Sequence, residues 1–206
     1  MIATIFVSKE VVENKITISI ITIFIQAFTH IIVIFLVLYF SPELRNRLFN
    51  TLGYNFLLVI ITCAIAFFIF TNIDVIFKVL KDFFEVEKSE NQKFLENIFN
   101  NNLGKIAVFI SAILVAPLIE ELAMRHSLFM LSGNRWLGLI FSTFYFAFMH
   151  VSGVNSNKEP ELVNIFSYLG LSLVISLVFV ISRENVAYSY ILHLINNLLA
   201  MIILLG

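Results

Sequence analysis

The chain has 206 residues, of which 60% are hydrophobic and 13% are charged, with 23 phenylalanines against 13 lysines and arginines together. Soluble proteins carry about 25% charged residues, so this composition excludes a water-soluble globule and indicates a protein embedded in lipid. The formal net charge is -1 and the lysines are scattered among acids, which excludes nucleic acid as the main partner. Cys63 is the single cysteine, so no intrachain disulfide can form.

Six apolar stretches are candidates for transmembrane helices, since a hydrocarbon core of ~30 Å needs about 20 helical residues. They are residues 16–40, 54–80, 104–131, 136–150, 162–182 and 187–205. The first stretch is too long for the apolar region of a signal peptide, so we expect it to remain as a span. Between the second and third stretches, acids and lysines mix with phenylalanines over residues 81–105. This segment predicts an interfacial amphipathic helix, with a solvated loop as the alternative.

The expected fold is all-α, a polytopic helical membrane protein of about six transmembrane helices plus the interfacial helix. No internal repeat or long linker divides the chain, so we expect one membrane domain with an N-terminal part, residues 1–102, and a core, residues 103–206. Pro117 removes a helical hydrogen bond, which predicts either one long kinked helix or a span followed by a short helix. Lysines and arginines are too evenly distributed to predict the orientation in the membrane.

Seven ionisable side chains lie in the strongly apolar parts of the predicted spans, where each costs about 2.5–3.5 kcal/mol of insertion energy and is therefore a functional hypothesis. They are His30, Glu120, Glu121, Arg125, His126, His150 and His193. Glu121 and Arg125 are four residues apart and can neutralise each other on one helix face. Glu120 has no such cation on its own helix, so we expect its partner on another helix. His30 is expected to make an interhelical hydrogen bond.

Helix lengths predict that several of these side chains lie at one depth in the membrane. If residues 104–131 and 136–150 form an antiparallel hairpin about Gly133, Glu120 lies 13 residues before the turn and His150 lies 17 residues after it. At ~1.5 Å per residue their depths differ by about 6 Å. His193 lies 8 to 10 residues beyond the turn at residues 183–185, which is roughly 12–15 Å deep, and Asn197 is one turn further. One carboxylate, two imidazoles and an amide are therefore expected in a common layer.

This set of groups is typical of a hydrolytic site. A carboxylate in an apolar site has a poorly solvated charged form and is a stronger base, and a neighbouring imidazole can share the proton of a bound water. The second imidazole and the amide can donate hydrogen bonds to an oxyanion, so the set predicts peptide hydrolysis. Glu120, His150 and His193 also have the composition of a catalytic zinc site, and the residues leave both possibilities open.

Three short motifs in the second half of the chain resemble the signatures of a known family. They are Glu120-Glu121-Leu-Ala-Met-Arg125, Phe146-Ala-Phe-Met-His150 and His193-Leu-Ile-Asn-Asn197. In order and spacing they are similar to the Glu-Glu-x-x-x-Arg, Phe-x-x-x-His and His-x-x-x-Asn/Asp signatures of the CAAX protease and bacteriocin-processing family, the Abi or Rce1-like intramembrane proteases. The resemblance covers residues 103–205.

The resemblance implies an intramembrane endopeptidase that cleaves a hydrophobic or lipidated peptide near the membrane surface. Such an enzyme would act in CAAX-type processing, in bacteriocin or peptide maturation, or in self-immunity. Glu120 would activate water with His150 as its partner, and His193 with Asn197 would form the oxyanion site. Residues 103–206 would then be the catalytic core.

The resemblance also implies supporting roles for Glu121 and Arg125, which would hold the helix end in shape, and for Phe146. A glutamate mechanism would need no cofactor, whereas a metalloprotease would hold zinc. The composition favours a bacterial plasma membrane, with lipid and a hydrophobic peptide as partners. Two other functions fit the same residues. One is a non-catalytic immunity protein that binds a bacteriocin, and the other is a small proton-coupled transporter.

Overall fold

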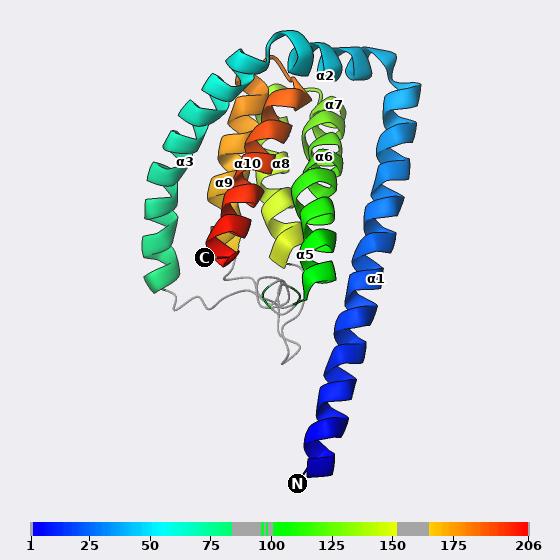
Figure 1. Cartoon of the computed structure of the whole chain (residues 1–206). Helices are drawn as coiled ribbons and strands as arrows, with labels where there is room; N and C mark the ends of the chain where they lie inside the picture. Colours follow the sequence, from blue (N-terminus) through cyan, green and yellow to red (C-terminus); the bar gives the residue numbers. More distant parts are fainter. Residues whose placement is uncertain (1, 84–95, 97, 99–100, 152–164, 206) are drawn as a thin grey trace.

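Figure 1 shows the computed structural model of the chain, which describes residues 2–83, 96, 98, 101–151 and 165–205. Within these residues the secondary structure is helical, as expected. The elements in chain order are α1 (Ile2–Phe40), α2 (Pro42–Tyr54), α3 (Phe56–Phe83), α5 (Asn102–Val108), the π-helix η1 (Phe109–Val115), α6 (Ala116–Glu121), the π-helix η2 (Leu122–Ser127), α7 (Leu128–Ser132), α8 (Arg135–Val151), α9 (Ile165–Ile181) and α10 (Val186–Leu205).

Four helical stretches in the described part of the chain are long and apolar enough to cross a membrane. They are Ile16–Phe40, Phe56–Ile76, Asn102–Ser132 and Val186–Ile203. Large apolar side chains on α1 and α3 remain exposed, including Phe28 and Phe68, and such a surface requires lipid as its solvent. The protein is therefore an integral membrane protein of the expected all-α class.

The predicted number of six spans is not confirmed. All six predicted stretches contain helix, but α8 and α9 have 17 residues each. At ~1.5 Å per residue such a helix rises about 25 Å, which is less than the ~30 Å of a hydrocarbon core. The predicted interfacial helix at residues 81–105 falls largely outside the described residues and stays a prediction.

The amphipathic helix that the structure does describe is α2, to which the sequence analysis assigned no element. It begins at Pro42 after Ser41 and lies across one end of the bundle, connecting α1 to α3 (Figure 1). Leu44, Leu48 and Thr51 form its buried face. The spacing of these residues is helical, so α2 packs one stripe onto the bundle and leaves its polar stripe outside.

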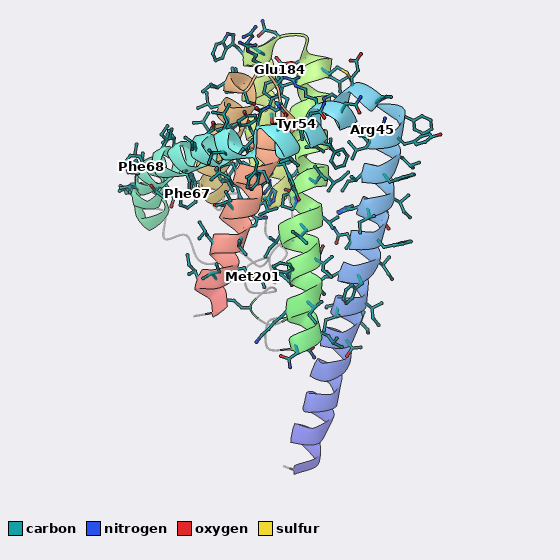
Figure 2. All side chains as sticks on the ribbon, turned by 45° about the horizontal axis from the view of Figure 1, so that its top comes forward. Arg45, Tyr54, Phe67, Phe68, Glu184 and Met201 are labelled. Atoms are coloured by element: carbon teal, nitrogen blue, oxygen red, sulfur yellow. The ribbon has the colours of Figure 1, made fainter. Side chains whose placement is uncertain are left out.

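The turn between α9 and α10 lies beneath α2. Arg183 and Glu184 adopt left-handed backbone angles there, with φ of 59° and 61°. The side-chain amide of Asn185 donates to Thr51 Oγ1 at 2.9 Å, and its oxygen accepts from the N–H of Ala187 at 3.1 Å. Figure 2 shows Arg45 of α2 and Glu184 of the turn at this same end of the bundle. These bonds fix where α10 enters the bundle.

The core lies around α9 and α10. Val174, Ile175 and Val178 of α9 are buried against α3 in a cluster that includes Leu192 of α10. Cys63 of α3 is buried in the same cluster. The opposite side of α9 packs against α8 through small polar residues, all buried, which are Ser142, Thr143 and Ser176. Small side chains allow the two helices to approach closely, as is common in membranes.

The hairpin predicted about Gly133 is present. Gly133 has φ of 62°, the left-handed conformation that ends α7 and reverses the chain into α8. Gly138 then packs against Phe129, and a Cβ atom at Gly138 would lie 2.8 Å from the Phe129 ring. This contact holds α8 close to the helix that carries Glu120 and Glu121.

Candidate active site

The helix that carries the two glutamates is one continuous helical stretch from Asn102 to Ser132. Of the two alternatives raised by Pro117, the long helix is therefore correct. Neither the π-helix η1 before Pro117 nor the π-helix η2 after Glu121 was predicted. Pro117 lies in the first turn of α6 and has no backbone N–H to donate in the series of helical hydrogen bonds. This missing donor favours a π-helical turn before it. Glu120 and Glu121 thus lie on a six-residue α-helical segment between two π-helical ones.

The predicted pair of Glu121 and Arg125 is confirmed. Arg125 Nη1 lies 3.3 Å from Glu121 Oε1, and both side chains are completely buried. The guanidinium also donates to Ser172 Oγ of α9 at 3.2 Å and lies 4.7 Å from the centre of the Phe146 ring. The Arg125 charge is therefore stabilised by Phe146 of α8 and Ser172 of α9, in addition to Glu121 on its own helix.

His193 of α10 lies between the two glutamates. Its Nδ1 is 2.9 Å from Glu121 Oε1, and its Nε2 is 3.6 Å from Glu120 Oε2. An ionised carboxylate only accepts hydrogen bonds, so Nδ1 carries a proton that it donates to Glu121. The expectation that a residue of another helix faces Glu120 is confirmed. The contact of His193 with Glu121 was not foreseen, because Glu121 was paired with Arg125 alone.

The two glutamates differ in their access to solvent. The Glu120 side chain is 29% exposed and the Glu121 side chain is 0% exposed. Neighbouring residues on a helix point about 100° apart, so one carboxylate is partly exposed while the other points into the core. The Arg125 charge offsets that of the buried Glu121 carboxylate, which limits the cost of burial.

His150 lies on the other side of Phe146. Its ring is 4.3 Å from the Phe146 ring and 4.7 Å from the Tyr168 ring, and its Nδ1 donates to the Phe146 carbonyl oxygen at 2.9 Å. The Phe146 ring also lies 5.6 Å from the His193 ring. The two imidazoles therefore lie within ~10 Å of each other on one aromatic side chain. No ion pair or hydrogen bond joins His150 to Glu120 in the part of the chain that the structure describes.

Asn197 is anchored to the helix of the glutamates. Its Nδ2 donates to the carbonyl oxygen of Ala112 in η1 at 2.9 Å, and its Oδ1 accepts from Asn196 at 3.2 Å. Tyr190, three residues before His193, donates its hydroxyl to the Leu114 carbonyl oxygen at 3.2 Å. One face of α10 thus contacts η1 and α6 through Tyr190, His193 and Asn197. Tyr190 was not predicted, although it shares the helical spacing of the other two.

The proposed zinc ligands do not fit a metal site in this geometry. Among the described residues, no group of three His, Cys, Asp or Glu side chains could hold a metal ion. The Nδ1 atoms of His150 and His193 are engaged with Phe146 and Glu121, so only the Nε2 atoms of the two rings are open to a ligand.

Two other features of the described residues lie apart from this cluster. His30 in α1 has a buried Nδ1 without a hydrogen-bond partner, so the expected interhelical bond to that atom is absent. An open apolar groove of about 500 Å³ lies along α8 and is lined by Leu128, Phe141, Phe144, Tyr145, Phe148 and Ile165. These α8 residues lie on a different face from Phe146 and His150, so the groove is not the site described above.

The comparisons with known proteins agree with the motifs. Residues 102–199 match the model of a family described as Rce1-like, type II CAAX prenyl endopeptidase Rce1-like. An uncharacterized protein of Mycoplasma capricolum subsp. capricolum is 28% identical over 124 residues, which cover 58% of this chain and 35% of that protein. The match thus spans about a third of the length of this curated relative. No solved structure matches the chain. The expected family is confirmed.

Proposed function

Residues 102–199 belong to the Rce1-like family of type II CAAX prenyl endopeptidases, and on this premise we propose that the protein is an intramembrane endopeptidase. Its substrate would be a hydrophobic or lipidated peptide cleaved near the membrane surface. The observation that carries the proposal is the pair of Glu120 and His193. Glu120 is the one partly exposed acid of an otherwise buried cluster, and an imidazole of another helix faces it.

Glu120 is the proposed general base. It accepts a proton from a bound water, whose oxygen forms a bond to the carbonyl carbon of the scissile amide, and the carbonyl oxygen becomes an oxyanion. When this intermediate collapses, the carbon–nitrogen bond breaks and Glu120 returns the proton to the leaving amine. Access to water is required for this role, and the buried Glu121 does not have it.

His193 and Asn197 are the proposed oxyanion donors. The Glu121 carboxylate accepts from Nδ1 of His193 and stabilises a positive charge on the ring, so the opposite nitrogen can donate to an oxyanion. Asn197 Nδ2 carries two N–H groups, of which one is engaged with Ala112. His150, supported by Phe146 and Tyr168, is assigned as the partner of Glu120 that binds the attacking water from the second side.

The test is hydrolysis of an internally quenched hydrophobic peptide, with and without a prenylated cysteine, by the purified protein in liposomes. Glu120→Gln and His150→Ala should each lower kcat by about 10²-fold or more, because each removes a group that handles the proton. Glu43→Gln, an exposed acid of α2, is the matched control and should retain the wild-type rate. Wild-type turnover in either site variant would remove that residue from the proposed mechanism.

The same variants distinguish the other two functions. An immunity protein that only binds a bacteriocin would protect cells equally well with Glu120→Gln, and the peptide would stay intact. A proton-coupled carrier would move a labelled solute into liposomes, and transport undiminished in His193→Ala would favour a carrier that does not depend on this cluster. Identification of the cleaved peptide by mass spectrometry would define the scissile bond.

A further inference from the structure

The π-helical turn before Pro117 leaves one carbonyl oxygen without a backbone donor. In η1 the N–H of Ala116 bonds to the carbonyl oxygen of Ser111, which is the five-residue register of a π-helix. The next donor in this register would be the N–H of residue 117, and its acceptor would be the carbonyl oxygen of Ala112. Proline has no N–H, so this bond cannot form.

The side chain of Asn197 occupies the place of the missing donor. Its Nδ2 donates to Ala112 O at 2.9 Å, so this partly buried carbonyl is satisfied by α10 instead of by its own helix. The Ala112 carbonyl oxygen can only accept, which fixes the donor end of the Asn197 amide, and Asn197 Oδ1 then accepts from Asn196 at 3.2 Å. With one N–H held in this way, the second N–H of Nδ2 has a defined direction, and none of the described residues accepts it.

We infer that Pro117 is a positioning residue for Asn197, which it orients by leaving Ala112 O open to the side-chain amide. The inference rests on the proposed function, in which Asn197 donates to the oxyanion. It assigns to Pro117 a role beyond shaping the helix. An N–H at residue 117 would compete for Ala112 O in the π register, and would bond to Ile113 O if the turn became α-helical. Either outcome changes the anchor of Asn197.

The first test is a double-mutant cycle on peptide hydrolysis. Pro117→Ala introduces the N–H and should lower kcat about tenfold or more, because loss of one oxyanion donor costs roughly 10²–10³-fold. In the background of Asn197→Ala the same change should have little further effect, within about twofold. Pro42→Ala, which removes a proline from the first turn of α2, is the matched control. Losses at positions 117 and 197 that multiply fully would overturn the inference.

A second variant separates the N–H from the proline ring. Lactic acid incorporated at position 117 is the ester analogue of alanine. It has an ester oxygen where Pro117→Ala has the backbone N–H, so it has neither the donor nor the proline ring. It should keep near-wild-type kcat, including where Pro117→Ala does not accumulate as folded protein. A folded ester variant as slow as Asn197→Ala, or an ester variant that does not fold, would show that the ring itself is required and would overturn the inference.

A third measurement does not depend on activity. The infrared amide band of Ala112, labelled with ¹³C and ¹⁸O at its carbonyl, reports the hydrogen bond to that oxygen. Asn197→Leu should shift the band to higher wavenumber in the protein with Pro117 and should leave it unchanged with Pro117→Ala. An unshifted band in the first case would overturn the inference. If instead the band shifts but wild-type protein and Glu120→Gln are equally inactive on peptides, the proposed function fails and the anchoring of Asn197 stands.

Discussion

The sharpest prediction of the site concerns the neutral substitution Glu121→Gln. The Glu121 carboxylate is fully buried, and its Oε1 lies 3.3 Å from Arg125 Nη1 and 2.9 Å from His193 Nδ1. Glutamine keeps the size of the side chain and can still accept from His193, but it removes the charge that compensates Arg125. Removing one partner of a buried ion pair costs about 3–5 kcal/mol, so we expect a loss of this size in the free energy of unfolding.

The assay is unfolding in mixed detergent micelles, followed by the fluorescence of Trp136, the single tryptophan. Glu120→Gln is the matched control, because it makes the same chemical change one residue earlier, at a partly exposed side chain whose contact with His193 is 3.6 Å long. It should cost less than ~1 kcal/mol. The double variant Glu121→Gln/Arg125→Met restores neutrality and should recover much of the stability lost by Glu121→Gln.

Two results would refute this reasoning. Equal losses of stability in Glu120→Gln and Glu121→Gln would mean that both carboxylates are structural. A Glu121→Gln protein that is as stable as the wild type and yet inactive on peptides would mean that Glu121 takes part in the chemistry, and the roles of the two glutamates would have to be exchanged.

Three further changes test the packing of the site and its need for a metal. Gly138→Ala places a Cβ 2.8 Å from the Phe129 ring and should destabilise the protein by about 1–3 kcal/mol, whereas Gly53→Ala, with open space around it, should not. Phe146→Leu removes the ring that contacts both imidazoles and should lower kcat about tenfold or more in the peptide assay. Exhaustive chelation should leave kcat unchanged, and a loss restored by zinc would contradict this.

The family and the polar cluster were predictable because charged residues are rare in apolar helices. Glu120, Glu121 and Arg125 stand out in a stretch that lipid would otherwise solvate, and helical spacing pairs Glu121 with Arg125 without any tertiary information. Depth counted along antiparallel helices also placed His193 opposite the glutamates. These predictions use only the fixed rise and rotation of a helix.

Rotation about the helix axis explains most of what the sequence did not reveal. Depth alone allowed His150 to face Glu120, whereas in the structure it lies against Phe146 and Tyr168. The rotation of a helix is set by its packing and by local changes of hydrogen-bond register, such as η1 and η2, which hydrophobic periodicity does not reveal. The helix α2 was missed for another reason, since a helix of mixed polarity after Ser41 resembles a loop.

In the proposed mechanism, the adjacent glutamates have two different roles because their surroundings differ. Rotation by about 100° brings Oε1 of Glu121 into contact with a guanidinium and an imidazole, and leaves Glu120 with one longer contact and access to solvent. The Glu121 side chain is 0% exposed and already contacts Arg125 and His193, so in the proposed mechanism it does not accept a proton from water. Glu120 can accept a proton because less of its hydrogen-bonding capacity is used. In the proposed mechanism, transfer of the water proton to Glu120 and not to Glu121 therefore requires that the contacts of Glu121 with Arg125 and His193 stay intact through each turnover.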